Sequence, residues 1–232
     1  MNKAQWYSSV PAKGEAVPWN ENRVDPDGVI RYRNTDAERA QYVRDLQNEL
    51  RFANDVPGLR VLDFGAGAGW FLAAMSSRLA KHGMEIDESA VAMWPKSIER
   101  IFEFGADTES AYDLVICHHV IEHCDRPEDI LSNLYCALRD RGLLIFATPD
   151  FDSPCAKRFG PAYRMLHDPT HISLFSRASA ERFLTDHLFT ILDVQYPFPE
   201  RYATAKNFAR WNDTQRVSPP WPGNWMTFYC RR

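Results

Sequence analysis

The chain has 232 residues, a formal net charge of −4 and a sequence pI near 6.0, a balance that argues against a nucleic-acid substrate. Its 45% hydrophobic and 25% charged residues are typical of a soluble globular protein, and its length suits one α/β domain.

The five cysteines are odd in number and form no C-x-x-C pair, which predicts reduced thiols in a cytoplasmic protein. The first residues contain no apolar core of a signal peptide. No apolar run approaches the roughly 20 residues of a membrane span, so we expect no stable membrane insertion.

Proline, glycine and the apolar periodicity divide the chain into elements. Residues 1–34 are polar and aromatic with three prolines, which indicates an irregular lead-in or lid before a domain over 35–232. We expect helices over 35–54, 69–80, 88–94, 127–139 and 177–188. We expect strands near 59–64, 82–86, 100–104, 112–117, 143–147, 189–194 and 225–230.

Alternating strands and helices predict an α/β fold with a doubly wound, seven-stranded, mostly parallel sheet. A Pro- and Trp-rich insert, 197–223, separates the last two strands and carries no helix signal. A parallel connection needs a long crossover, usually a helix. We therefore expect the last strand to be antiparallel.

A glycine-rich turn follows the first strand of this sheet. The apolar run ends at Asp63, glycines follow at 65, 67 and 69, and Glu85 comes twenty residues after Gly65. Glycine permits positive φ and a close approach of a ligand to the backbone. An acid at the end of the next strand suits the hydroxyls of a ribose. The pair predicts a nucleoside site across adjacent strand ends.

Two common nucleotide motifs are missing. Trp70 stands where a dinucleotide fingerprint needs its third glycine, and an indole there would crowd a pyrophosphate. The chain contains no G-x-x-x-x-G-K-[ST] motif, so a P-loop is also unsupported.

The remaining pattern, D-x-G-x-G-x-G followed by G-x-E, resembles the S-adenosylmethionine (SAM) site of class I methyltransferases. Downstream, Asp113 to Pro127, with Glu122-His123, resembles the fourth motif of the methyltransferase-11/23 type. Thr148-Pro149-Asp150 and the segment from His171 to Ser176 resemble later motifs of that group. The resemblance implies a SAM-dependent methyltransferase with a Rossmann-like fold.

The resemblance also implies roles for individual residues. The turn would approach the methionine moiety, Glu85 would bind the ribose, Ile86 would pack on adenine and His118 would line the floor of the site. The implied cofactor-binding residues are Asp63, Gly65, Ala66, Gly67, Gly69, Glu85, Ile86 and His118. The acid that the family carries after strand three has no clear match, so the adenine contacts around 103–105 are unassigned.

Histidines supply the candidates for catalysis. An oxygen acceptor must lose its proton, which a histidine near neutral pKa can accept. We predict that His123 and His171 flank the acceptor, with one of them serving as the general base, because both follow strand ends at the edge that carries the glycine turn. A divalent cation at His119, Glu122 and His123, where similar quinone O-methyltransferases carry E-x-x-E-H, is an alternative; our assignment has no metal.

The expected acceptor is a small molecule. Similar short methyltransferases often act on sugars or precursors of polysaccharides and natural products, which favours an O or N atom of an activated sugar. The aromatic insert can bind such a ring or pack as core. The alternatives are a quinone-type catechol O-methyltransferase and a SAM-binding partner subunit without catalysis. The oligomeric state is not predicted.

Overall fold

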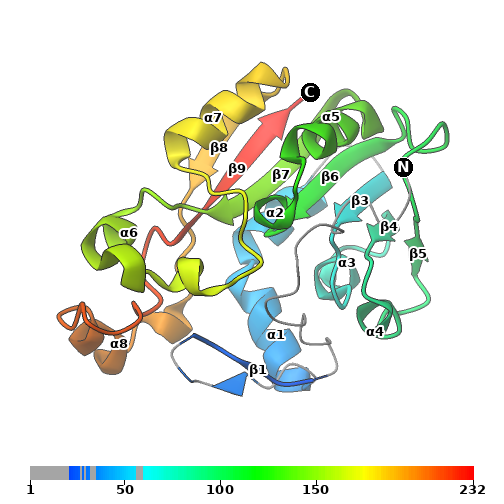
Figure 1. The fold of residues 1–232 in the computed structure, drawn as a ribbon. Coiled ribbons are helices and arrows are strands. Elements are labelled where there is room, and N and C mark those ends of the chain that lie inside the picture. The colour runs from blue at the N-terminus through cyan, green and yellow to red at the C-terminus, as the bar shows by residue number, and fades with distance from the viewer. Residues whose placement is uncertain (1–20, 27, 29, 32–34, 56–59) are drawn as a thin grey trace.

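A seven-stranded sheet organises the computed structural model, which describes residues 21–26, 28, 30–31, 35–55 and 60–232 (Figure 1). The strands are β3 (Arg60–Phe64), β4 (Ala80–Met84), β5 (Ile98–Arg100), β6 (Tyr112–His118), β7 (Leu138–Pro149), β8 (Thr190–Gln195) and β9 (Trp225–Arg231). Their order is β5-β4-β3-β6-β7-β9-β8, and β9 is antiparallel to both neighbours while the others run parallel. The predicted fold class and the antiparallel last strand are confirmed.

The strand order positions the site. The chain begins the sheet at β3, moves outward through β4 and β5, and returns to β6 on the other side of β3. In doubly wound sheets, ligands bind where the order reverses, outside the carboxyl ends of the strands. The residues that follow β3, β4 and β6 therefore meet at one edge.

Helices cover both faces of the sheet. They are α1 (Asp36–Asp45), α2 (Gln47–Asp55), α3 (Trp70–Ala74), α4 (Glu88–Val91), α5 (Pro127–Ala137), α6 (Pro154–Phe159), α7 (Arg177–Asp186) and α8 (Ala205–Arg210). Short 3-10 turns lie at Ile121–His123 (η2), Gly160–Ala162 (η3), Arg164–His167 (η4) and Glu200–Tyr202 (η5). Among the described residues, no helix is long and apolar enough to cross a membrane.

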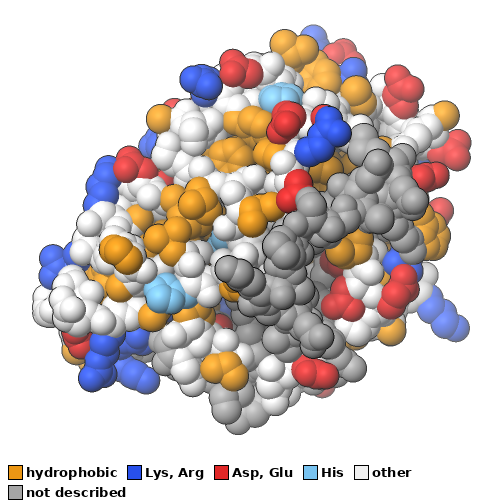
Figure 2. Space-filling model, viewed as in Figure 1, with side chains coloured by type: hydrophobic (Ala, Val, Ile, Leu, Met, Phe, Trp, Pro, Cys, Tyr) orange, Lys and Arg blue, Asp and Glu red, His pale blue; other side chains and the backbone are white. Residues whose placement is uncertain are grey.

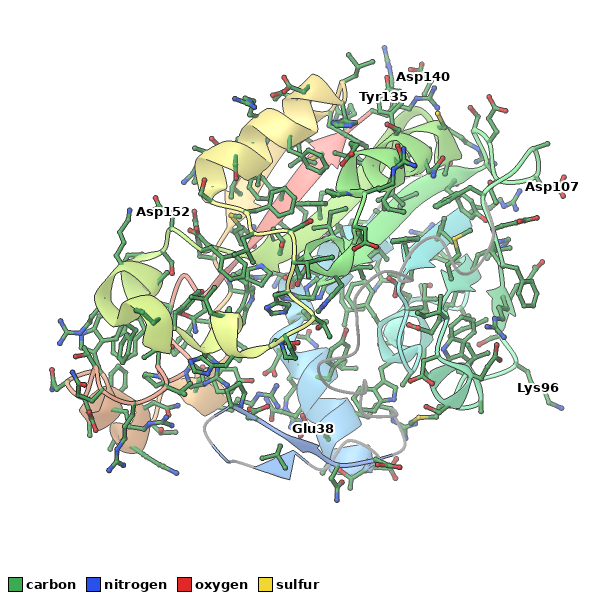
Figure 3. All side chains as sticks on the ribbon, in the orientation of Figure 1. Glu38, Lys96, Asp107, Tyr135, Asp140 and Asp152 are labelled. Carbon is green, nitrogen blue, oxygen red and sulfur yellow. The ribbon has the colours of Figure 1, made fainter. Side chains whose placement is uncertain are left out.

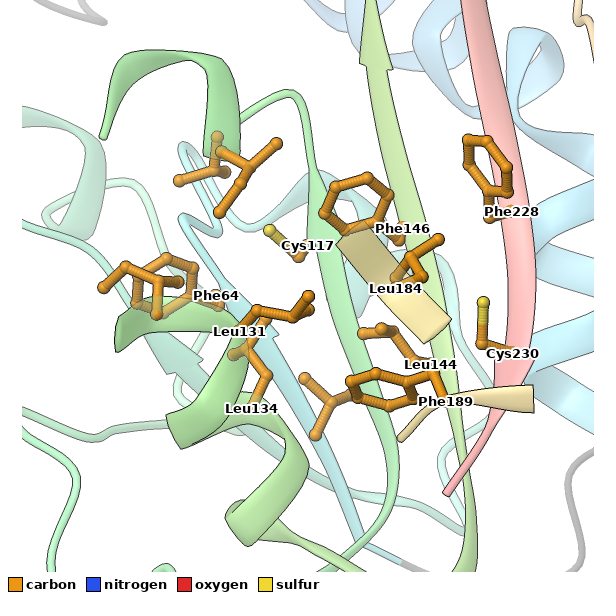
Figure 4. Close-up of a cluster of buried hydrophobic side chains, with 14 of the residues drawn as sticks. Phe64, Cys117, Leu131, Leu134, Leu144, Phe146, Leu184, Phe189, Phe228 and Cys230 are labelled. Carbon is orange, nitrogen blue, oxygen red and sulfur yellow. The ribbon is translucent and has the colours of Figure 1, made fainter. Parts of the chain in front are cut away.

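Side chains alternate between the two faces of each central strand. Phe64 and Phe146 point toward α5 and α7, where they pack with Leu131 and Leu184 (Figure 4). Val61 and its neighbours on the opposite face pack against α2 and α3. Both faces are buried, as a mostly parallel sheet requires.

The predicted helix over 35–54 is two helices. Leu46 leaves helical geometry, with φ −106° and ψ 25°, and separates α1 from α2. No described residue of α1 is buried, whereas α2 buries Glu49, Leu50 and Ala53. The break lets α2 turn its apolar face toward the sheet.

The second strand begins earlier than predicted. Helix α3 ends at Ala74, because Met75 adopts an extended conformation, and β4 spans Ala80–Met84 instead of 82–86. Strand β5 likewise ends at Arg100, and β7 extends over Leu138–Pro149. Glu85 consequently follows the strand directly, at the edge of the sheet.

The insert 197–223 contains helix, contrary to the prediction. Thr204 caps α8 by accepting a hydrogen bond from the Asn207 backbone N–H, and η5 precedes it. The Pro and Trp content of the insert concealed this short helix.

The lead-in lies mostly outside the described residues. Within the described part, β1 (Arg23–Val24) pairs antiparallel with β2 (Ile30–Arg31), so this stretch is not wholly irregular. Asp25 forms a buried ion pair with Arg164, at 3.4 Å. The lead-in is thereby attached to η4. The remainder of 1–34, including 1–20, and residue 59 of the predicted first strand are outside the described residues.

Candidate functional site

The glycine turn joins the ends of β3 and β4. Gly65, Gly67 and Gly69 have φ of 77°, 51° and 72°, which other residues rarely adopt. The backbone N–H groups of Gly65 and Ala66 both donate to the carbonyl of Met84, at 2.8 and 3.0 Å. A Cβ on Gly65 would lie 2.4 Å from a Val120 methyl group, so only glycine fits there.

Trp94 supports this turn from behind. Its Nε1–H donates to the carbonyl of Gly67 at 2.7 Å. Its ring also approaches Gly69 and Gly83 so closely that a Cβ on either glycine would lie within 2.8 Å of it. Trp94 was not predicted from the sequence, because the glycine spacing carries no signal for a side chain packed behind the turn.

Glu85 connects the two parts of the nucleotide motif. Its carboxylate accepts hydrogen bonds from the backbone N–H groups of Gly67 (2.8 Å), Ile86 (2.7 Å) and Asp87 (2.9 Å). The Ile86 side chain beside it is exposed. The residues expected at the ribose and at the methionine moiety are therefore in direct contact.

Asp63 and His118 are buried polar groups at the same edge. Burial, reinforced by the negative charge of Glu85, raises the pKa of Asp63 from 3.8 to about 7. Burial and the adjacent His119 hold the pKa of His118 well below its ordinary value. The Nε2 atom of His118 is buried without a hydrogen-bond partner among the described residues. A cationic, polar ligand such as SAM fits this arrangement, because it would stabilise the Asp63 carboxylate and offer His118 a partner.

His119 and Glu122 form a pair directly after β6. His119 adopts φ 56°, and its backbone N–H donates to the Ala147 carbonyl at 2.9 Å. Its Nδ1 lies 3.1 Å from Glu122 Oε1, and Glu122 is 1% exposed. Thr148 Oγ1 donates to the other carboxylate oxygen at 3.2 Å. The Glu122 carboxylate is thus fixed through both of its oxygens.

The two histidines predicted to flank the acceptor lie together. The ring centroids of His123 and His171 are 4.8 Å apart. Nδ1 of His123 lies 3.1 Å from the Thr170 carbonyl, and Nδ1 of His171 lies 2.6 Å from the Met165 carbonyl. Backbone N–H groups of residues 172 and 173 donate to the Glu122 carbonyl, which attaches this loop to η2. Burial lowers the pKa of His171.

The potential metal ligands are grouped differently from the sequence-based alternative. Donor atoms of Glu122, His123 and His171 lie within 4.8 Å of one another. His119 contacts Glu122 but is not part of this group. It also lies before η2, a single 3-10 turn, so His119 and His123 are not one turn apart on a helix.

Aromatic side chains border His119. Its ring contacts Trp225 edge-on at 6.0 Å between centroids, and Tyr202 contacts the same indole at 6.4 Å. Arg201 covers the Tyr202 ring and pairs with Glu38 of α1, which is labelled in Figure 3. One end of the insert consequently lies at the same edge as the histidines.

Two tryptophans of the insert pack, partly buried, against the small core around α6. Trp211 and Trp221 stack at 4.0 Å with an 18° interplanar angle. Phe159 of α6 and Phe208 of α8 pack against their edges. These tryptophans thus stabilise the contact between α6 and the insert.

Comparison with known proteins identifies the family. The profile of a family described as a methyltransferase domain matches residues 35–194. The chain belongs to this methyltransferase family. The methyltransferase is 26% identical over 204 residues to malonyl-[acyl-carrier protein] O-methyltransferase of Halalkalibacterium halodurans, covering 78% of this chain and 73% of the relative. It is 25% identical over 114 residues to ubiquinone biosynthesis O-methyltransferase of Rickettsia conorii.

That second match covers 42% of this chain and 37% of the relative. The crystal structure of a SAM-dependent methyltransferase from Archaeoglobus fulgidus superposes with a TM-score of 0.60 at 16% identity, over 83% of this chain and 94% of that one. The protein is a SAM-dependent methyltransferase, and the predicted family, cofactor and enzyme class are confirmed.

Proposed function

We propose that this methyltransferase transfers the methyl group of SAM to a small-molecule acceptor, at an O or N atom of an activated sugar or a related precursor. The observation that supports this most directly is the group of histidines around the buried Glu122, next to the glycine turn. Such a group can receive the proton of a hydroxyl acceptor. Both curated relatives named above are O-methyltransferases, which favours oxygen.

The sequence-based assignment of the site residues remains a proposal. Asp63, His118 and the glycine turn would hold the methionine part of SAM. Glu85 would give up a hydrogen bond from a backbone N–H and accept hydrogen bonds from the ribose hydroxyls instead. Tyr202 and Trp225 would offer apolar ring faces to the acceptor, as pockets for sugars and other rings commonly do.

The cellular setting is also a proposal. All five cysteines are free, which supports a reducing compartment such as the cytoplasm. On the face drawn in Figure 2, Lys and Arg side chains of the described residues are interspersed with Asp and Glu. This distribution supports a small acceptor over a nucleic acid, which requires a basic surface.

A catechol acceptor of the quinone type is the second candidate. The match to the Rickettsia enzyme and the grouping of Glu122, His123 and His171 favour it, because a cation held there could bind adjacent hydroxyls.

Formation of S-adenosylhomocysteine tests both candidates. We expect product with nucleotide sugars and none with a catechol or a malonyl thioester. Turnover of the catechol alone would establish the second candidate, and turnover of none of these acceptors would refute the proposed acceptor class.

A further inference from the structure

We propose that His119 is the general base of methyl transfer and that Glu122 is the residue that positions it. The inference deepens the proposed function and rests on it. It gives the base role to His119 in place of His123 or His171.

The backbone at His119 is the first observation. A non-glycine residue with φ of 56° is uncommon, and such residues cluster at functional sites. The hydrogen bond from the His119 N–H to the Ala147 carbonyl holds this conformation in place. The chain therefore turns immediately after β6 and directs the imidazole toward Trp225.

The partner of the imidazole is the second observation. Glu122 is almost fully buried, and its two oxygens are bound by His119 Nδ1 and Thr148 Oγ1. Burial acts to raise the pKa of Glu122, but the hydrogen bond from His119 and the nearby histidines outweigh it, so the pKa lies below its ordinary value. The carboxylate is therefore ionised, and it favours the tautomer of His119 with hydrogen on Nδ1.

The other candidate histidines lack either the short carboxylate contact at Nδ1 or an accessible Nε2. His118 has its Nε2 buried and its pKa strongly lowered by burial, so it stays neutral. Nδ1 of His123 contacts the carbonyl and the hydroxyl of Thr170, and Nδ1 of His171 contacts the Met165 carbonyl, so neither has the short carboxylate contact that His119 Nδ1 has. The nearest Asp168 oxygen lies 3.9 Å from Nε2 of His171, the atom that a base would need free. The side chain of His119 is 31% exposed, and the structure records no hydrogen bond at its Nε2 among the described residues. A free, accessible lone pair is what a base requires.

The position of His119 also suits the reaction. Val120, the next residue, is the one that packs against Gly65 in the glycine turn. The imidazole consequently lies beside the segment that would hold the methionine part of SAM. His119 Nε2 accepts the proton of the acceptor hydroxyl while the oxygen bonds to the methyl carbon. The electron pair of the S–C bond stays on sulfur, which leaves a neutral thioether, and the proton later passes to solvent.

Kinetics with the identified acceptor provide the first test. His119→Gln should lower kcat by about 10²–10⁴-fold while the Kd for SAM, measured by calorimetry, changes less than about threefold. His187→Gln is the matched control, because His187 caps the end of α7 and its Nδ1 contacts the Phe183 carbonyl of the same helix. Full turnover by His119→Gln, or a comparable loss only in His123→Gln or His171→Gln, would overturn the assignment.

The tautomer of His119 provides a second test that needs no acceptor and no SAM. In ¹⁵N NMR of the full chain, Glu122→Gln should increase the population of neutral His119 with hydrogen on Nε2, because the amide can donate to Nδ1 whereas the carboxylate only accepts. The same variant should lower kcat while the Kd for SAM changes little.

A merely structural role for Glu122 would reduce stability without changing the tautomer of His119, which would overturn the positioning role. The NMR result stands even if no acceptor is turned over, so failure of the proposed function and failure of this assignment are distinguishable.

Discussion

Replacing Asp63 with asparagine should change how the stability of this methyltransferase depends on pH. Burial, and then the charge of Glu85, raise the pKa of Asp63 from 3.8 to about 7. Between these values the folded protein keeps a proton that the unfolded chain has released. The folded state binds more protons in this window, so the free energy of unfolding falls as pH rises through it.

The size of the effect follows from the shift. About 3 pKa units at roughly 1.36 kcal/mol each correspond to a loss on the order of 4 kcal/mol between pH 4 and pH 7. Asparagine occupies the same volume and does not ionise. The free energy of unfolding of Asp63→Asn, relative to the natural chain, should therefore rise across this window and level off above pH 7.

The affinity for SAM should depend on pH in the opposite direction from the stability. A cationic ligand stabilises the ionised carboxylate, so SAM should bind the natural chain more tightly as pH rises through 7, with release of a proton. Asp63→Asn should bind SAM more weakly and without this pH dependence.

Urea denaturation from pH 4 to pH 8 measures the stability, and calorimetry in two buffers of different ionisation enthalpy measures the proton. Asp140→Asn, at an exposed position of β7, is the control. Parallel stability curves for Asp63→Asn and the natural chain would refute the reasoning.

Three further predictions concern the cofactor turn and the potential metal ligands. Glu85→Ala should raise the Kd for SAM about 10- to 100-fold in calorimetry, the effect of losing hydrogen bonds to a charged group, and an unchanged Kd would place the ribose elsewhere. Trp94→Phe keeps an aromatic six-membered ring but loses the pyrrole N–H that bonds the Gly67 carbonyl, so the lost hydrogen bond should cost about 1 kcal/mol, or roughly 2–4 °C in Tm. A larger loss would show that ring packing dominates. EDTA should leave methyl transfer unchanged, and a loss restored by zinc or magnesium would assign the glutamate and histidine cluster to a cation.

The sequence predicted those parts of the molecule that depend on local pattern. Strand-length apolar runs and the glycines after Asp63 specified the sheet and the turn, because positive φ and strand periodicity leave direct traces in residue type. The predicted ends of helices and strands were less accurate where tertiary packing decides them. Helix α3 ends after five residues, and α8 forms in a segment whose Pro and Trp content suggested none.

In the candidate site, too, the features set by local residue pattern were predicted and those set by tertiary contacts were not. Glu85 was predicted from its spacing to the glycine turn, and the structure places the two in contact. Trp94 and the grouping of Glu122 with His171 were not predicted, because both depend on contacts between residues distant in sequence. The φ of His119 depends on a hydrogen bond to β7, which one segment alone cannot reveal.

The reversed direction of β9 has a consequence for how acceptor preference can evolve. Because β9 runs antiparallel, its first residue, Trp225, pairs with Pro149 at the carboxyl end of β7. The insert before it is thus delivered to the edge where we propose that the acceptor binds, while the glycine turn comes from a separate stretch around β3 and β4. Mutations, insertions and deletions within 197–223 can therefore alter the proposed acceptor side without displacing β3 and β4, so preference for the acceptor and binding of the cofactor can diverge independently.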